Sequence, residues 1–339
     1  MDVLKNKYIY LAISWVLFFL SILLLLIPKL NLGIDMTWGI QMEYDYETSI
    51  NIDSIKEKLE SERKLFLNNN EIVINNINVY WITWEKTVAV VVWFYNNIEE
   101  KQLEELKISF KSKVFDAIKW EDDTVVETKY INIGKSFGDY IKDTAFITLI
   151  LAIVAITFYV TFAFSWVVSG ISVLSFSMIT IITLFHDVII SSWAYIFISM
   201  FFPEFQIDTF FITALLTILW YSINDTIVVF DRIRSNLKKY AGKTWKDEKK
   251  LSEIINISVN ETLRRSIYTS LTLLFVLMSI FLFWPETISW FILVMMFGTL
   301  VGTYSSIFIA SPILYIVNRN KKLTVYKKAV VNPEDKIVV

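Results

Sequence analysis

The sequence contains no cysteine and a single histidine, His186. The absence of cysteine excludes disulfides, thiolate catalysis and cysteine-ligated zinc, and one histidine cannot form a histidine-rich metal cluster. Basic residues are not in excess either, because 32 Lys and Arg stand against 34 Asp and Glu. The net charge of −2 provides no overall positive field to attract nucleic acid. We therefore expect no bound metal, no cofactor and no nucleic-acid partner.

Glycine is also scarce, with 8 glycines against 12 tryptophans. An average usage of about 7% would give roughly 24 glycines in a chain of this length. Charged residues make up only 19% of the chain, whereas 55% of the residues are hydrophobic and the mean hydropathy is +0.51. This composition excludes a soluble globular domain and a disordered chain. It is typical of a membrane protein, although such proteins normally use glycine freely for close helix packing.

The apolar residues gather in runs that are long enough to cross a bilayer. The first run, Tyr8–Ile27, has 20 residues, and about 20 helical residues span a hydrocarbon core of roughly 30 Å. A cleaved signal peptide is the alternative, but no small-x-small cleavage site follows this run. Five further spans are predicted at Thr144–Phe164, 177–201, Asp208–Phe230, Ser266–Phe283 and Trp290–Val317. The predicted fold class is a polytopic α-helical membrane protein with six transmembrane helices.

Residues 29–140, between the first two spans, are polar and acidic. Over residues 28–140, 13 Lys and Arg stand against 20 Asp and Glu, a net charge of −7. Strand and helix periodicities alternate in the order β-α-β-β-α-β. The expected elements are Gly39–Tyr46, Ile50–Leu67, Ile72–Tyr80, Thr87–Trp93, Ile98–Ile118 and Thr124–Ile131. This order predicts one small α+β domain of the ferredoxin-like, split βαβ type.

Basic residues are concentrated in two segments that six spans would place on the same side of the membrane. The connector 231–265 holds ten Lys and Arg, and the tail 318–339 holds six. The positive-inside rule makes this side cytoplasmic, together with the N-terminus. We predict four parts: residues 1–28 with the first span, an extracytoplasmic domain at 29–140, a five-helix transmembrane region at 141–317 and the basic cytoplasmic tail.

One ionisable side chain, Asp225, is predicted well inside the fourth span. An aspartate at the centre of a span costs about 2.5–3.5 kcal/mol even on a lenient insertion scale, so its presence requires a reason. Asn224 precedes it, and the candidate cationic partner is Arg265, one turn before Thr269 at the entry of the fifth span. A carboxylate that is neutralised by a proton or held charged by an arginine can act as a proton relay. The alternative is a static ion pair that orders the bundle.

A second polar pair, His186-Asp187, lies within the third span. It is either a secondary element of a proton relay or a polar pair at a helix kink or cavity, and the sequence favours neither. The sixth span carries small residues spaced four apart: Gly298, Gly302, Ser306 and Ala310. Such a stripe lets another helix approach closely, so we assign it to helix packing.

Several motifs are similar to those of a known family and occur in the order found there. They are Gly33–Gly39 (G-I-D-M-T-W-G), His186–Ile189, Tyr221–Arg234, Thr262–Ser266 and Gly302–Ser306. The block Y-S-I-N-D-T followed by D-R-I-R within Tyr221–Arg234 is highly specific. The first motif resembles a structural G-[IL]-D-[FM]-T-G-G element and matches it at Gly33, Asp35, Thr37 and Gly39. By these motifs the chain resembles SecF, the smaller membrane subunit of bacterial SecD–SecF protein-export complexes.

The resemblance implies an RND-type half transporter that pairs with a SecD-like subunit and acts on exported polypeptides beside the Sec translocon channel and its accessory subunits. It implies that the proton motive force promotes late steps of translocation across the bacterial cytoplasmic membrane, with no enzymatic activity. The family's proton site falls on Asp225, its arginine on Arg265, with Arg264 as the alternative, and a polar neighbour on Thr269. An RND-type permease for lipids or small molecules and a non-transporting assembly subunit are the other functions open to this sequence.

Tryptophan occupies several positions where the family has glycine or another small residue: Trp38, Trp81, Trp193, Trp220, Trp284 and Trp290. A tight turn requires a positive φ, which glycine adopts freely and a bulky residue does not. We hypothesise that many of these residues are glycines encoded by UGA in a lineage that reads this codon as glycine. The alternative is genuine tryptophan at the membrane interfaces, where aromatic residues gather.

Overall fold

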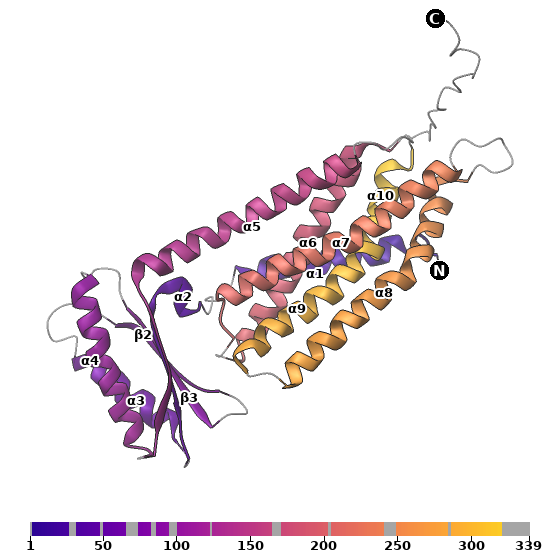
Figure 1. Ribbon diagram of the computed structural model, residues 1–339. Helices are drawn as coiled ribbons and strands as arrows, with labels where there is room; N and C mark the ends of the chain where they lie inside the picture. Colours follow the sequence, from indigo (N-terminus) through magenta and orange to yellow (C-terminus); the bar gives the residue numbers. More distant parts are fainter. Residues whose placement is uncertain are drawn as a thin grey trace, which may run out of the picture.

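The structure, a computed structural model, describes residues 2–26, 32–47, 50–65, 74–82, 86–94, 100–122, 124–164, 171–202, 205–240, 249–283 and 286–320. Figure 1 shows two parts, a small domain built on a β-sheet and a bundle of long helices. Helix α5 (Lys135–Phe164) begins at the sheet domain and runs along the bundle. The chain therefore has the two-part organisation that its composition indicates.

The sheet domain contains four strands and two helices in the predicted β-α-β-β-α-β order. They are β1 (Gly39–Asp45), α3 (Ile52–Leu65), β2 (Ile74–Ile82), β3 (Thr87–Phe94), α4 (Glu100–Lys119) and β4 (Val126–Ile133). The strands lie in the order β2-β3-β1-β4, and every neighbouring pair is antiparallel. This is the topology of the split βαβ type.

The two faces of the sheet pack against different partners. On one face, Met42 and Val90 join Phe110 of α4 in the core of the domain. On the opposite face, Val91 packs with Ile34, which belongs to the short helix α2 (Ile34–Thr37) beside the bundle. Since successive side chains of a strand point to opposite faces, β3 is buried along its whole length. The face without helices thus turns toward the bundle.

The bundle consists of α1 (Lys7–Leu25), α5, α6 (Val173–Ser199), α7 (Thr209–Tyr240), α8 (Leu251–Phe283) and a final helix in three segments. These segments are α9 (Glu286–Ser305), a π-helical turn (Ser306–Ala310) and α10 (Ser311–Asn318). Five of the described helices are long and apolar enough to cross a membrane. The predicted first span, α1, has 19 residues, about 28 Å of helix. The chain is a multi-pass helical membrane protein.

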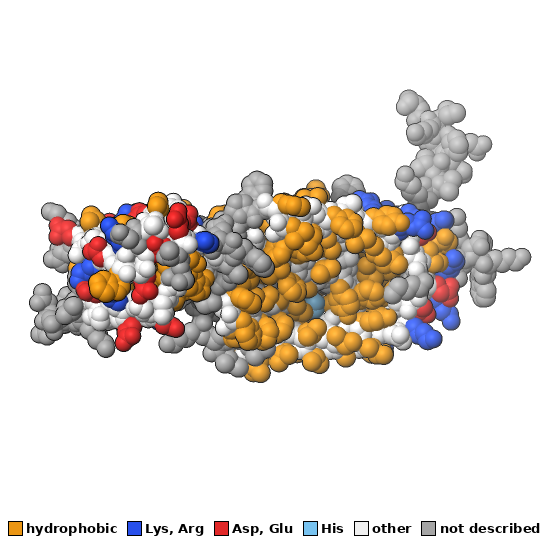
Figure 2. Space-filling model, turned by 90° about the horizontal axis from the view of Figure 1, so that it is seen from below, with side chains coloured by type: hydrophobic (Ala, Val, Ile, Leu, Met, Phe, Trp, Pro, Cys, Tyr) orange, Lys and Arg blue, Asp and Glu red, His pale blue; other side chains and the backbone are white. Residues whose placement is uncertain are grey.

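The surface of the bundle agrees with this assignment. Figure 2 shows a broad band of hydrophobic side chains on the bundle, with mixed charges on the sheet domain at one end and Lys and Arg at the other. Phe146, Ile150 and Phe158 of α5 are among the exposed residues. Soluble monomers rarely expose continuous apolar surface of this extent, so the band marks the part of the molecule that faces lipid.

Helices α7 and α8 extend past the predicted spans at the basic end of the bundle. Much of the connector 231–265 is therefore helix, while residues 241–248 and the tail from residue 321 lie outside the described residues. Asn236 Nδ2 of α7 donates to Glu261 Oε2 of α8 at 2.6 Å, and Arg232 Nε donates to the same oxygen at 2.7 Å. These hydrogen bonds hold the two helices together beyond the apolar band.

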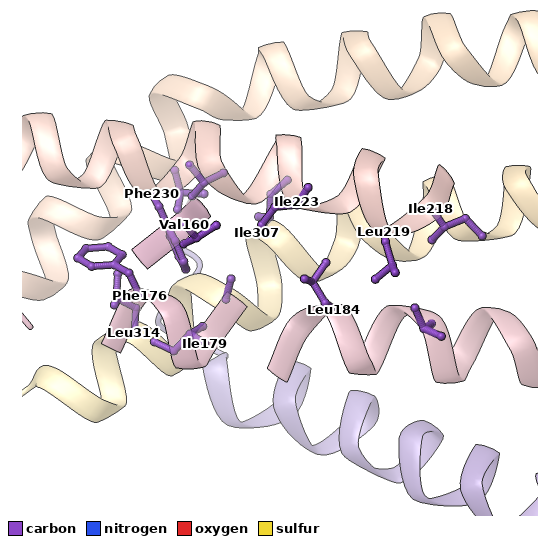
Figure 3. Packing of buried hydrophobic residues seen from close by; sticks show 14 of the residues in the cluster. Val160, Phe176, Ile179, Leu184, Ile218, Leu219, Ile223, Phe230, Ile307 and Leu314 are labelled. Atoms are coloured by element: carbon purple, nitrogen blue, oxygen red, sulfur yellow. The ribbon is translucent and has the colours of Figure 1, made fainter. Parts of the chain in front are cut away.

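Large apolar side chains fill the space between α6, α7 and their neighbours (Figure 3). The ring of Phe176 on α6 lies 5.2 Å from that of Phe230 on α7 and 5.1 Å from that of Phe164 on α5. Leu184 of α6 and Ile307 of the π-helical turn belong to the same cluster. This core fixes the relative positions of α6, α7 and the final helix, which carry the polar groups described below.

Trp38 has an unusual backbone conformation. Its φ is 61° and its ψ is 143°, and it is the one non-glycine residue with a positive φ in the described part of the chain. Such a conformation costs a non-glycine residue about 1–3 kcal/mol. A Cβ added to Gly138 of α5 would lie 3.1 Å from the Trp38 Cβ, so the site is also crowded. Glycine would suit this position, in agreement with the recoding hypothesis.

The other tryptophans at expected glycine positions have varied surroundings. Trp290 lies with its ring centroid 3.8 Å from that of a neighbouring phenylalanine, closer than the usual aromatic distance of about 4.5–7 Å. Trp193 has a buried Nε1 without a partner among the described residues. Trp81 and Trp220 are exposed, and Trp284 lies outside the described residues. Crowding and an unsatisfied polar group thus mark two of these positions, whereas exposure makes two others tolerant of tryptophan.

Candidate functional site

Asp225 lies in the middle of α7, and its side chain is buried. Its carboxylate accepts two hydrogen bonds from serine hydroxyls. Ser266 Oγ of α8 donates to Oδ1 at 2.6 Å, and Ser306 Oγ, at the start of the π-helical turn, donates to Oδ2. The carboxylate therefore connects α7 with α8 and with the final helix.

Asp187 of α6 is a second carboxylate in the bundle and is fully buried. Its Oδ2 accepts hydrogen bonds from Ser222 Oγ of α7 and, at 2.7 Å, from Ser305 Oγ of α9. Its Oδ1 lies 2.9 Å from His186 Nδ1. The His186 ring stacks on Phe18 of α1, and its Nε2 has no partner among the described residues. Helix α6 runs through this position without interruption, and the pair is part of a buried polar cluster.

The two carboxylates belong to one cluster because their serines are neighbours. Ser222 and Asp225 are one turn apart on α7, and Ser305 and Ser306 are adjacent where α9 becomes π-helical. Adjacent residues on an α-helix point about 100° apart, so two successive serines can serve acceptors on two different helices. Single π-helical turns are often found at functional sites.

Close contact between α7 and α9 depends on the predicted stripe of small residues. A Cβ at Gly302 would lie 3.1 Å from the Ser222 Cβ, and one at Gly298 would lie 2.2 Å from the Cγ1 of Ile218. Ser306, which the spacing assigns to packing alone, also donates to Asp225. The stripe therefore both packs the helices and brings hydroxyl groups to the carboxylates.

Further hydroxyl groups continue from Asp225 toward the sheet domain. The Tyr221 hydroxyl lies 2.7 Å from Ser270 Oγ, and Ser270 Oγ lies 2.6 Å from Thr303 Oγ1. Ser270 is one turn from Ser266 and also donates to its carbonyl oxygen at 2.6 Å. Hydroxyl groups can both donate and accept, so these three side chains form a continuous row of hydrogen-bonding groups along the interface of α7, α8 and α9.

The predicted contact between Asp225 and Arg265 is absent. No ion pair joins the two residues, although both lie in the described part of the chain, and the Arg265 side chain is exposed, as are Arg264 and Thr269. The physical reason is helix geometry, because Ser266 faces Asp225 and the preceding residue points about 100° away. Arg265 therefore makes no direct contact with Asp225, and only its charge reaches the carboxylate.

Polar and exposed side chains also occur on the outer surface of α7. Asn224, next to the buried Asp225, points away from the bundle, and Thr213 lies on the same exposed side. Trp220, between them on this side, is 65% exposed. Asn224 is thus not brought to the carboxylate, and it is exposed, as are Arg265 and Thr269 of α8.

The Gly33–Gly39 motif lies where the sheet domain meets the bundle. Thr37 Oγ1 donates to the Gly33 carbonyl oxygen at 2.8 Å, which closes the short helix α2. Asp35 Oδ2 accepts a hydrogen bond from the backbone N–H of Thr209, the first residue of α7, at 2.6 Å. Gly39 begins β1, where a Cβ would lie only 2.3 Å from a carbonyl oxygen of β3. The motif therefore connects the sheet domain to α7.

The sequence does not identify the hydroxyl partners of the carboxylates as a set. Ser222 is visible as a polar neighbour of Asp225, but Ser266, Ser270 and Ser305 are not singled out. The available signal is spacing, because Ser266 and Ser270 are four residues apart and Ser305 precedes a member of the small-residue stripe. Apolar membrane helices that enclose two carboxylates bound to hydroxyl groups, with an α+β domain at one end, define a multi-pass membrane protein of transporter type.

Comparison with known proteins identifies the family. The family model described as "Protein export membrane protein SecD/SecF, C-terminal" matches residues 113–320. The protein translocase subunit SecF of Sebaldella termitidis is 31% identical over 324 residues, which cover 95% of this chain and 93% of that protein. SecF of Rickettsia rickettsii is 33% identical over 328 residues, which cover 95% and 94% of the two chains.

The crystal structure of SecDF, a translocon-associated membrane protein from Thermus thermophilus, has a similar fold, with a TM-score of 0.72 at 24% identity. The similarity covers 94% of this chain but only 38% of that longer chain. The chain belongs to the SecD/SecF family of protein export membrane proteins and within it to the SecF translocase subunits. This membership makes it a transport subunit and not an enzyme, as the motifs imply.

Proposed function

We propose that this subunit uses the proton motive force to promote late steps of protein translocation and that Asp225 is its proton-carrying group. The observation that supports this proposal is the binding of a buried carboxylate by two hydroxyl groups, with no cation in contact among the residues that the structure describes. An arginine in contact would hold the carboxylate charged. Serine hydroxyls serve an ionised carboxylate as donors, and one of them can turn to accept from the protonated form. Asp225 can therefore change protonation state without losing its partners.

Asp187 and His186 would take a secondary part in this proton transfer. Ser222 and Ser305 bind Asp187 and lie next to the residues that surround Asp225. A change of protonation at one carboxylate would therefore affect the surroundings of the other through the shared helices. The unpartnered Nε2 of His186 leaves one polar atom of the cluster available for water or for a proton. These features support the relay hypothesis for the pair.

Arg265 and Thr269 would act together with a partner subunit. Both side chains are exposed on α8, one residue before and three residues after Ser266, whose hydroxyl group contacts Asp225 inside the bundle. Exposed polar groups at this depth are costly unless another protein covers them. A SecD-like subunit of six similar spans would cover these exposed side chains. Its binding would place charged groups of that subunit near Arg265. The translocon channel and exported polypeptides are further proposed partners.

The proposed topology has six spans, with α1 as the first, and places the sheet domain (residues 29–140) outside a bacterial cytoplasmic membrane. Asn256 at the start of α8 donates to Asp2 at 2.7 Å, so the N-terminus lies at the same end as the basic connector. Figure 2 shows mainly Lys and Arg among the charged side chains at this end, whereas charges of both signs lie on the sheet domain at the other end. The positive-inside rule then makes this end cytoplasmic, with residues 141–317 as the transmembrane region and 318–339 as the tail.

The test is Asp225→Asn in membrane vesicles that hold the complete translocon and the natural partner subunit. We expect the variant to assemble at normal levels, because the amide keeps the shape of the carboxylate and an acceptor oxygen. Stimulation of translocation by an imposed proton gradient should be lost, while gradient-independent translocation continues. Asp143→Asn, an exposed change on α5, is the matched control and should behave as the wild type.

Three outcomes separate the candidate functions. Full gradient-dependent stimulation in Asp225→Asn would contradict proton coupling at this residue. If the same variant also preserved assembly of the complex, the non-transporting assembly role would be favoured. Gradient-driven movement of a lipid or small molecule by purified protein in liposomes, without translocation partners, would favour the permease function.

A further inference from the structure

The junction between the sheet domain and the bundle contains a pair of carboxylates that the proposed function does not use. Leu32 forms a β-bridge with Ile207, and Gly33 N donates to the Ile207 carbonyl oxygen at 2.9 Å. These contacts place α2 against the segment that precedes α7. The two carboxylates, Asp35 and Asp208, lie at this contact.

Both carboxylates cap the outer end of α7. Asp35 Oδ2 accepts hydrogen bonds from the N–H and the hydroxyl of Thr209, and Asp208 Oδ1 accepts from the N–H of Phe211 at 2.7 Å. The first N–H groups of a helix need acceptors, and negative charge is favourable there. The other oxygen of Asp35, Oδ1, is buried and has no hydrogen-bond partner among the described residues. One helix end thus holds two carboxylates, one of which has an unsatisfied oxygen.

Gly33 lets the two carboxylates come together. A Cβ at this position would lie 2.7 Å from Asp35 Oδ1 and 3.0 Å from the Asp208 Cβ. The space that a side chain would fill is therefore taken by Asp35 and Asp208 themselves. This explains why the junction requires a residue without a side chain at position 33.

The surroundings offer these carboxylates little compensating charge. They line a cavity of about 280 Å³ between the helix-free face of the sheet and the outer ends of α6, α7 and α9. The charged groups that face it from the sheet are Glu43 of β1 and Lys129 of β4, which pair with each other at 2.8 Å. From α6, the Tyr195 hydroxyl faces the cavity and donates to the Gln206 carbonyl oxygen at 2.7 Å. No described cation forms an ion pair with Asp35 or Asp208.

We propose that Asp208 is a second proton-binding site, and that a proton bound there, beside Asp35 at the outer end of α7, fastens the sheet domain to this helix. Protonation of Asp208 removes one of two neighbouring negative charges. Loss of the proton leaves two like charges in a partly closed site, which weakens the contact between α2 and α7. Proton binding at this site does not require proton transfer at Asp225.

The predicted fourth span begins at Asp208, whereas the helix that is long and apolar enough to cross a membrane begins at Thr209. Asp208 lies just before this helix, and the pH range follows from its titration. Burial raises the pKa of Asp208 from 3.8 to about 6, and the negative charge of Asp35 adds to the increase. We call the contact between α2 and α7 docking. Because the pKa of Asp208 is higher in the docked state, docking is most stable below about pH 4 and weakens as the pH rises to about 6. A difference of about two pKa units corresponds to a change of roughly 100-fold in the docking constant. Above this range the constant should vary little.

Hydrogen exchange at the junction measures this equilibrium even when the undocked state is rare. The full-length protein in nanodiscs is compared at about pH 4 and about pH 8, with intrinsic exchange corrected and the amides of β3 as reference. We expect the protection of the amides of Gly33 and Thr209 to fall by about 100-fold at the higher pH. Asp208→Asn should remove this pH dependence, and Asp35→Asn should reduce it.

Two further variants make the outcome decisive. Asp139→Asn, an exposed change at the start of α5, is the matched control and should keep the wild-type pH dependence. Asp225→Asn should also keep it, so failure of the proposed proton coupling would be distinguishable from failure of this site. Equal protection at both pH values in the wild type, or an unchanged pH dependence in Asp208→Asn, would overturn the proposal.

Discussion

Asp187 provides a quantitative test of how the buried polar cluster holds the bundle together. Its carboxylate is bound by Ser222 and Ser305 and contacts His186, so Asp187→Ala leaves three polar groups in an apolar core. Hydrogen bonds to charged groups contribute about 1.5–3 kcal/mol each. The sum overestimates the loss, because Ser305 Oγ already lies 3.1 Å from the Gly302 carbonyl oxygen and can turn to it fully. We expect a destabilisation of about 3–5 kcal/mol, as for other broken buried charge clusters.

Asp187→Asn separates the effect of charge from that of shape. The amide oxygen can accept from both serines, and the amide N–H can donate to His186 Nδ1 when this nitrogen is unprotonated. The expected destabilisation is about 1–2 kcal/mol, because the hydrogen bonds remain but lose their charge. The order of stability should therefore be wild type, Asp187→Asn and then Asp187→Ala.

The assay is thermal unfolding of the purified protein in detergent, followed by tryptophan fluorescence, since a chain without cysteine gives no signal with thiol dyes. At about 2 °C or more per kcal/mol, Asp187→Ala should lower the Tm by at least about 6 °C. Asp143→Ala on the exposed side of α5 serves as the control and should leave the Tm unchanged. A Tm of Asp187→Ala equal to that of the wild type, or equal losses in both Asp187 variants, would refute the reasoning.

Gly302 and Trp38 are the sites of two smaller tests. Gly302→Leu should push α9 away from Ser222 and lower the Tm by overpacking of about 1–3 kcal/mol, whereas Gly302→Ala should cost clearly less, because its Cβ meets Ser222 at 3.1 Å. Equal effects of both variants would argue against close helix contact at this position. Mass spectrometry of the native protein should find glycine at position 38, where φ is 61°, and a tryptophan there would end the recoding hypothesis.

The elements with strong periodicity could be predicted from the sequence. The alternation in Gly39–Tyr46 and the β-rich run Thr87–Trp93 locate two strands to within a residue or two, and the long apolar runs locate the long helices. The ends of α7 and α8 at the basic end of the bundle could not be predicted, because their charged residues resemble a loop in composition. They are helical because Asn236 and Arg232 find partners on the neighbouring helix, which no local pattern reveals.

Some residues of the candidate site could be predicted from the sequence, and others could not. Asp225 and Asp187 stand out in sequence because a carboxylate is costly in an apolar span. Their partners do not stand out, because serine is common in membrane helices and its role depends on which helix lies opposite. Arg265 shows the limit of the argument from charge alone. The sequence pairs it with Asp225, whereas its neighbour Ser266 makes the contact and Arg265 faces outward.

Helix α7 is the element that both proposed proton sites share. Asp208 precedes its outer end and Asp225 lies 17 residues further on, about 25 Å along a helix that rises 1.5 Å per residue. A helix transmits a displacement over this distance when both points are held by specific contacts. Asp35 holds α7 at its first residue, and Ser266 and Ser306 hold it at Asp225, in the middle of the helix. A proton at the outer site that changes how the sheet domain holds α7 would therefore shift the position of Asp225 relative to its serines. Coupling of this kind requires that one element has two states and that both sites favour one state over the other. Helix α7 is the element that both sites contact.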